Sequence, residues 1–304
     1  MEMLDPLSAS KQEAAQRFSE IREPKMNDEY WKFSSPENFT SDKSLGKISK
    51  NNAVMVDVES DDSLKIFFVD GCLDHSNSNL GEFTDIEVFG MNSKEVEQVD
   101  WVRNLYGNIE KEAQVKLRRG LAAFNTAHAK EGVFIRVSGQ LKHTIIINYS
   151  GDKEGSDALI HNLLRVEDSA SVTLIETGEG GSRANRLLEC DILENADCNH
   201  IRFFGNNTLA HILTQCFVRQ TKSSTYNQFS LTVKNVFSRN ESFVSLEGEG
   251  CKTSISAASI GEEGTLQDDT VFIAHMMPNC ESRQVFKKVL THDAVGIFQG
   301  KIFV

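Results

Sequence analysis

The chain contains little proline. Only 4 of its 304 residues are prolines, and Pro278 is the single one after residue 132. Since proline cannot donate to a β-ladder, the second half can form regular strands with few interruptions. With 39% apolar and 25% charged residues, the composition is that of a globular protein with one large or two ordinary domains.

Long apolar runs are also missing. The strongest runs, Ile145–Ile147 and Ile66–Val69, have the length of a strand, whereas a bilayer-spanning helix needs roughly 18 residues. The N-terminal segment carries Glu2, Asp5 and Glu13, which argues against a signal or transit peptide. We therefore expect a cytoplasmic protein without a membrane partner.

No basic block offsets the acidic residues, which number 44 against 32 basic residues and give a net charge of −12. This balance argues against nucleic-acid binding by phosphate neutralisation. A partner with a basic face, or solubility alone, explains the acidity better. The 6 cysteines include no Cys-x-x-Cys pair, so we expect reduced, buried and inert thiols.

Residues 1–131 predict an α-helical or mixed N-terminal region. Ser10–Glu13 matches a capping box at the start of a helical lead, and Pro24 ends that helix. The aromatic cluster Glu29–Phe33 is expected to dock the lead onto the rest of the protein. A further helix is predicted over residues 109–128.

Residues 132–304 alternate apolar and polar side chains in short runs, which is typical of β-strands. Polar corners recur between the runs, and their starts are 27, 28, 26 and 30 residues apart. The corners are Glu167–Ser169, Glu194–Ala196, Lys222–Ser224, Gly248–Gly250 and Pro278–Asn279. A repeat of roughly 27 residues without a helical pattern predicts a β-solenoid. An antiparallel sandwich gives similar alternation, but the even spacing and the scarce proline favour the solenoid.

Three clusters could carry chemistry. His275 and Cys280 flank a turn and could ligate a soft metal, but one pair does not close a site, so we expect His275 to end a strand and Cys280 to pack inward. Cys198 and His200 share one face of a strand, and we interpret them as a core cysteine and a surface histidine. The paired carboxylates of Asp268–Asp269 could serve a calcium-dependent β-helix enzyme acting on acidic polysaccharides, but we interpret them as solvated corner charges.

In the segment from residue 269 to residue 304, a short β-run enters the Pro278–Asn279 turn, a Ser-Arg-Gln step with a following lysine comes next, and a second run closes on Phe298–Gly300. This segment resembles the SufB/SufD family, and within it the SufD branch. Arg283 could satisfy several corner carbonyls or contact a partner. The candidate interaction residues are Ser282, Arg283, Gln284, Lys287, His275 and Cys280.

The resemblance implies a mainly β fold, a right-handed parallel β-helix over residues 132–304. It implies a non-enzymatic scaffold subunit of the SufBCD complex, which assembles iron–sulfur clusters. Such a subunit pairs with a SufB-like scaffold through the β-helix and couples to the SufC-type ATPase. It holds no stable cofactor alone, because the iron–sulfur cluster forms transiently at the level of the complex.

Family members continue beyond a step such as Gln299–Ile302. The resemblance therefore implies a C-terminally truncated chain with an incomplete β-helix and impaired ATPase docking. Two other classes stay open, a β-helix carbohydrate-active enzyme and a stand-alone binding solenoid. Membership of the SufB branch would predict a Ser-Arg-Ile-like step in place of Ser282–Gln284.

Overall fold

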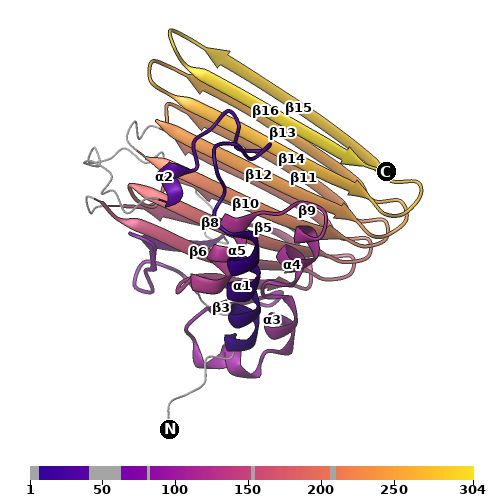
Figure 1. The fold of residues 1–304 in the computed structure, drawn as a ribbon. Coiled ribbons are helices and arrows are strands. Elements are labelled where there is room, and N and C mark those ends of the chain that lie inside the picture. Colours follow the sequence, from indigo (N-terminus) through magenta and orange to yellow (C-terminus); the bar gives the residue numbers. More distant parts are fainter. Residues whose placement is uncertain (1–6, 41–62, 81–82, 152–154, 206–209) are drawn as a thin grey trace.

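The computed structural model describes residues 7–40, 63–80, 83–151, 155–205 and 210–304. Within these residues, two 8-stranded sheets lie face to face, and successive strands alternate between them to build a solenoid (Figure 1). Neighbouring strands pair in parallel, except where β2 joins β1 and β3 joins β4. The parallel β-solenoid predicted from the corner spacing is therefore confirmed.

Strands that are neighbours in a sheet are mostly not consecutive in the chain. Sheet I runs β15-β13-β11-β9-β7-β5-β1-β2, and sheet II runs β16-β14-β12-β10-β8-β6-β4-β3. The strands of sheet I are β1 (Leu64–Val69), β2 (Cys72–Leu73), β5 (Gln140–Ser150), β7 (Ser171–Thr177), β9 (Asp197–Gly205), β11 (Thr225–Val233), β13 (Lys252–Gly261) and β15 (Glu281–Leu290). The strands of sheet II are β3 (Ile86–Gly90), β4 (Val133–Val137), β6 (Asp157–Val166), β8 (Arg183–Ile192), β10 (His211–Gln220), β12 (Phe237–Leu246), β14 (Leu266–His275) and β16 (Val295–Phe303). The domain boundary at residue 132 stays a prediction, and strands from both sides of it share these sheets.

The five predicted corners stack along one edge of the solenoid. Each contains one residue with a left-handed φ, between 57° and 74°. These residues are Ser169, Asn195, Ser223, Gly250 and Asn279. In the first four of these corners, the amide of this residue donates to a carbonyl of the next corner, as from Ser169 N to Glu194 O at 2.8 Å and from Ser223 N to Glu249 O at 2.9 Å. The left-handed residue thus turns the chain and extends the hydrogen-bond ladder around the corner.

Side chains that follow a corner cap its remaining carbonyls. Ser224 Oγ donates to Thr221 O at 2.7 Å, and Cys251 Sγ lies 3.0 Å from Gly248 O. Cys251 is therefore buried at a position where its thiol can donate a hydrogen bond to a corner carbonyl.

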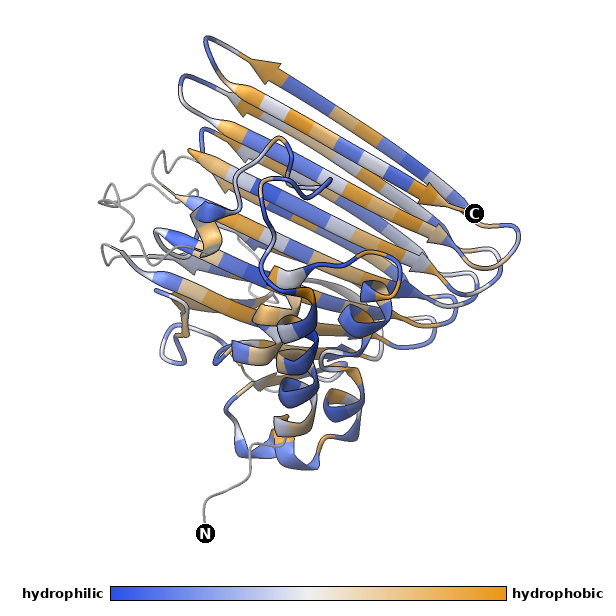
Figure 2. Ribbon diagram, in the orientation of Figure 1, coloured by the Kyte–Doolittle hydropathy of each residue, from blue (hydrophilic) through white to orange (hydrophobic). Residues whose placement is uncertain are grey.

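Aliphatic side chains fill the solenoid interior in its first turns. Leu64, Ile66 and Ile147 of sheet I face Val133 and Ile160 of sheet II in one buried cluster. Figure 2 shows apolar and polar residues alternating along the strands. This alternation is the period-2 pattern of a strand with one face inward.

The helices pack on one side of the solenoid, near its foot except for α2, which lies higher (Figure 1). They are α1 (Ser8–Ile21), α2 (Glu37–Thr40), the 3-10 helix η1 (Lys94–Gln98), α3 (Asp100–Leu105), α4 (Asn108–Gln114) and α5 (Gly120–His128). Helices α4 and α5 contact β6, β8 and β10, so they cover the outer face of sheet II. None of the helices in the described part of the chain has the length and apolarity needed to cross a membrane.

Two helix predictions need correction. The capping box at Ser10–Glu13 is wrong, because α1 begins at Ser8 and its N-cap Leu7 has no side-chain cap. The single helix over residues 109–128 is two helices. The Gln114 side chain ends the first one, accepting from Arg119 N at 2.5 Å and donating to Arg119 O at 2.8 Å. These bonds replace the helical ladder and leave Val115 exposed.

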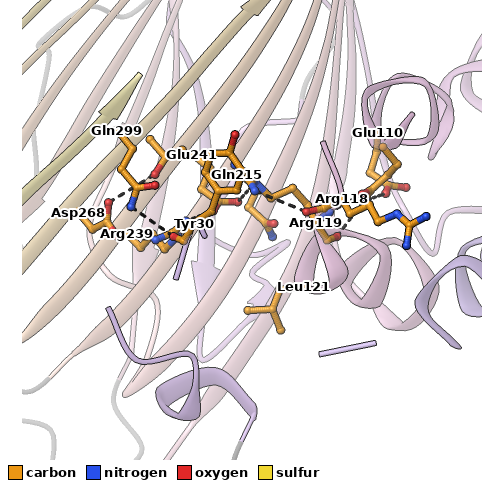
Figure 3. A network of polar contacts seen from close by, with 12 residues as sticks. Tyr30, Glu110, Arg118, Arg119, Leu121, Gln215, Arg239, Glu241, Asp268 and Gln299 are labelled. Atoms are coloured by element: carbon orange, nitrogen blue, oxygen red, sulfur yellow. Dashed lines mark hydrogen bonds and ion pairs between the residues drawn. The ribbon is translucent and has the colours of Figure 1, made fainter. Parts of the chain in front are cut away.

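A buried ionic network anchors the N-terminal lead to sheet II (Figure 3). Arg239 of β12 is fully buried, pairs with Asp268 of β14, and donates to Ser34 Oγ at 2.9 Å. Its guanidinium lies 4.1 Å from the ring centroid of Trp31. The aromatic cluster around Trp31 therefore docks the lead, as predicted.

A second pair extends this network. Arg119 lies 3.3 Å from Glu241 and stacks 4.5 Å from the ring centroid of Tyr30. Both Asp268 and Asp269 are buried, so their interpretation as solvated corner charges is wrong. They point to opposite faces of β14, because adjacent residues of a strand alternate.

Candidate functional site

The solenoid interior changes from apolar to polar in its middle turns. On β9 the buried, inward positions hold His200 and Arg202, while Ile201 and Phe203 lie on the outer face. On β11 the inward set begins with Tyr226 and is otherwise polar. Groups buried this deeply need hydrogen-bond partners inside the solenoid.

One polar line connects four turns. Tyr149 donates to Glu176 Oε1 at 2.7 Å, His200 Nε2 lies 2.7 Å from Glu176 Oε2, and His200 Nδ1 lies 2.9 Å from the Tyr226 hydroxyl. Burial lowers the pKa of His200, which favours a neutral ring. Burial raises the pKa of Glu176, but His200 and the Arg186 guanidinium outweigh it and hold the pKa below its usual value. A neutral imidazole therefore lies between a carboxylate and a phenol. The prediction that His200 is a surface residue is wrong.

Three thiols lie beside this line. A hydrogen bond to Cys198, together with burial, raises the pKa of Cys190 well above its ordinary value. Burial raises the pKa of Cys216 to about 12, although its Sγ lies 3.5 Å from the Tyr226 hydroxyl. These two thiols stay protonated at neutral pH, so their packing fits the buried cysteines that we expected. Cys72 is exposed, so the expectation of a buried thiol is wrong there.

A second polar line runs toward the last turn. Arg202 donates to Thr214 Oγ1 at 2.9 Å, and Thr214 donates to Asn240 Oδ1 at 2.8 Å. Asn240 donates to Asp269 Oδ1 at 3.0 Å, and Lys288 pairs with the other oxygen of Asp269. Because inward positions stack in register from turn to turn, short side chains reach across the gap between turns.

This second line ends at a cavity of about 530 Å³ between β15 and β16, which we call the mouth. Its walls include Gln284, Phe286, Lys288, Phe298 and Ile302. The rings of Phe286 and Phe298 lie 4.5 Å apart, and Phe298 and Ile302 are 49% and 53% exposed. The mouth therefore combines an apolar surface with the end of a polar line.

The six predicted interaction residues fall on different faces of the last turn. Ser282 and Gln284 point inward, whereas Arg283 and Lys287 lie exposed on the outer face of β15. His275 ends β14, and its Nε2 lies 2.9 Å from Ser282 Oγ.

Cys280 is partly buried, with Sγ 3.2 Å from Gly248 O. The proposed structural role of Arg283 is wrong, because backbone amides and the side chains after each corner satisfy the corner carbonyls. The role of the six predicted interaction residues in binding a partner stays a prediction.

Sequence reasoning missed Glu176, Arg186 and Arg202. The signal that could have found them is the corner spacing, since an offset of 26 residues pairs Ser171 with Asp197 and so places Glu176 beside Arg202. No group of three or more His, Cys, Asp or Glu side chains in the described residues is arranged to hold a metal ion.

Comparison with known proteins identifies the family. The model of the SufBD core domain, described as SUF system FeS cluster assembly, matches residues 148–304, which is more than half of the chain. No curated protein matches the chain closely enough to count as a relative. The matched residues are those that build the polar interior, the stacked corners and the mouth. The chain therefore belongs to the SufBD core-domain family of the SUF system for iron–sulfur cluster assembly.

Proposed function

We propose that this chain is a non-enzymatic scaffold subunit of a cytoplasmic SufBCD complex. Its SufBD core match supports a role in iron–sulfur cluster assembly. The Ser282–Gln284 step supports the SufD branch over the SufB branch. In this proposal the cluster is the cargo of the complex and forms transiently, so the chain alone holds no stable cofactor.

The observation that carries this proposal is the fold of the residues that the family model matches. Residues 148–304 form stacked parallel turns of a solenoid with a polar interior. We propose that a SufB-like scaffold pairs with this β-helix.

Co-expression tests this proposal. The tagged chain is produced with a SufB-like scaffold and a SufC-type ATPase, and the eluted stoichiometry and visible cluster absorbance are measured. We expect recovery of the scaffold together with visible cluster absorbance. A folded chain that recovers neither partner would contradict the proposal.

The alternative of a carbohydrate-active enzyme would use Asp268 and Asp269, and the structure buries both carboxylates. Asp268 is paired with Arg239 under the N-terminal lead, and Asp269 is paired with Lys288 inside the solenoid. Neither carboxylate is free to bind calcium or sugar on an open face.

A further inference from the structure

The outer face of sheet I has an inverted pattern of polarity. On β9 and β11, most inward side chains are polar, and the outward side chains in the C-terminal half of each strand are apolar. The apolar outward residues of the middle turns are Ile201, Phe203, Phe229, Leu231, Val233 and Ile260. A strand shifted by one residue would exchange the two sets, so the register itself places the apolar set outward.

These residues form a continuous surface. Ile201 pairs with Phe229 and Phe203 with Leu231 on neighbouring strands, so their side chains lie next to each other. Phe229 is 39% exposed and Ile260 is 42% exposed. Helices α4 and α5 cover sheet II instead, and no buried apolar cluster formed by the described residues includes these outward residues. An apolar surface of this kind on a folded chain marks an interaction site.

Two cations border this surface. Arg283 and Lys287 are exposed on β15, in register with Ser254 and Ala258 of β13, and neither has an ion pair among the described residues. Their positive charge stands out on a chain with a net charge of −12. A partner that buries the apolar surface and carries carboxylates at its border would match both features.

We propose that the outer face of sheet I binds an acidic amphipathic helix of a partner protein. The backbone groups of β9, β11 and β13 are already paired on both sides within the sheet, so this face cannot accept an added strand. It can bury the apolar side of a helix, which is how helices pack on sheets. Glutamates or aspartates beside that apolar side would then reach Arg283 and Lys287. This inference does not depend on the proposed pairing with a SufB-like scaffold.

A synthetic helical probe tests the proposal on the full chain. The probe has about 18 residues, enough to support helical structure, with leucines on one side and flanking glutamates. A control peptide carries lysines in place of the glutamates. Fluorescence anisotropy measures the Kd of each peptide. We expect the glutamate peptide to bind more tightly than the lysine peptide, with a difference that shrinks at high salt.

Variants locate the binding surface. Phe229→Asp should weaken binding by about tenfold or more, and Arg283→Glu with Lys287→Glu should reverse the preference between the two peptides. Val115→Asp, at an exposed apolar position elsewhere, should change neither affinity. Circular dichroism and the melting temperature show whether each variant is folded.

Three outcomes would overturn the proposal. The first is no binding of the glutamate peptide, or binding that Phe229→Asp leaves unchanged. The second is self-association in sedimentation that Phe229→Asp abolishes, which would assign this face to a second copy of the chain. The third is binding to vesicles that contain phosphatidylserine but not to the peptide, which would assign the face to a lipid surface.

Discussion

Replacing Arg239 with methionine removes a cation that the fold buries completely. The guanidinium pairs with Asp268, donates to Glu241 Oε1 at 2.8 Å, and stacks on Trp31. Methionine keeps much of the volume but none of the charge, so among the described residues Asp268 retains two hydroxyl donors, Ser34 at 2.7 Å and Thr270 at 3.4 Å, but no cation. Leaving one charge of a buried pair without its partner costs about 3–5 kcal/mol. At about 2–4 °C per kcal/mol for a chain of this size class, Tm should fall by about 6–20 °C.

The cost of Arg239→Met should depend on pH. Burial already raises the pKa of Asp268 above 3.8, and loss of Arg239 should raise it further. A carboxyl group whose pKa is higher in the folded state stabilises the fold at low pH and loses that contribution as pH rises through the folded pKa. The deficit should therefore be larger at pH 8 than at pH 5.

Urea unfolding, followed by fluorescence in a Trp101→Phe background that leaves Trp31 as the reporter, measures this deficit. Adding Asp268→Asn removes the unpaired charge and should restore part of the stability at pH 8. A loss below about 1 kcal/mol, or a double variant no more stable than Arg239→Met at pH 8, would refute the reasoning.

Three further predictions concern single positions, each read out as the free energy of unfolding. Burial raises the pKa of Glu179 to about 7, so its stabilising contribution is present below pH 4.5 and is lost as pH rises through 7. The stability of Glu179→Gln relative to the parent chain should therefore increase by up to about 3 kcal/mol between pH 5 and pH 8. A difference in stability that does not change with pH would contradict this. A Cβ at Gly132 would lie 1.9 Å from His161 O, so Gly132→Ala should cost about 1–3 kcal/mol, and an unchanged Tm would show that the backbone adapts. Ser223 has φ 57°, so Ser223→Gly should be neutral or stabilising by up to about 1 kcal/mol whereas Ser223→Val should destabilise, and the reverse order would exclude strain at this corner.

The sequence predicts the solenoid well because its corners carry local information. A polar residue in the left-handed region, such as Asn195 or Asn279, marks a turn within three or four positions. The regular recurrence of such corners then predicts stacking. The split of the 109–128 helix was not predictable in this way, because it depends on the side chain of Gln114 folding back onto Arg119.

The candidate site was harder to predict because alternation does not say which face of a strand points inward. Ile201 and Phe203 are the apolar set of β9, and a local argument places them in the core. The structure places His200 and Arg202 there instead, because Glu176 on the adjacent strand β7 and Thr214 on β10 of the facing sheet supply their partners. Those partners are 12 to 24 residues away in sequence, and only the three-dimensional register brings them together.

The two polar lines also distinguish one turn of the solenoid from another. The backbone ladder is the same at every turn, so on its own it would accept a turn threaded one repeat too early or too late. The interior does not repeat. Arg202 meets Thr214, and Asn240 meets Asp269, at one place each. A chain that skipped or exchanged a turn would bury a guanidinium or a carboxylate without its partner. Each turn of the solenoid thus has its own buried polar partners. These partners specify the order in which the turns stack during folding, which the repeated backbone ladder alone does not.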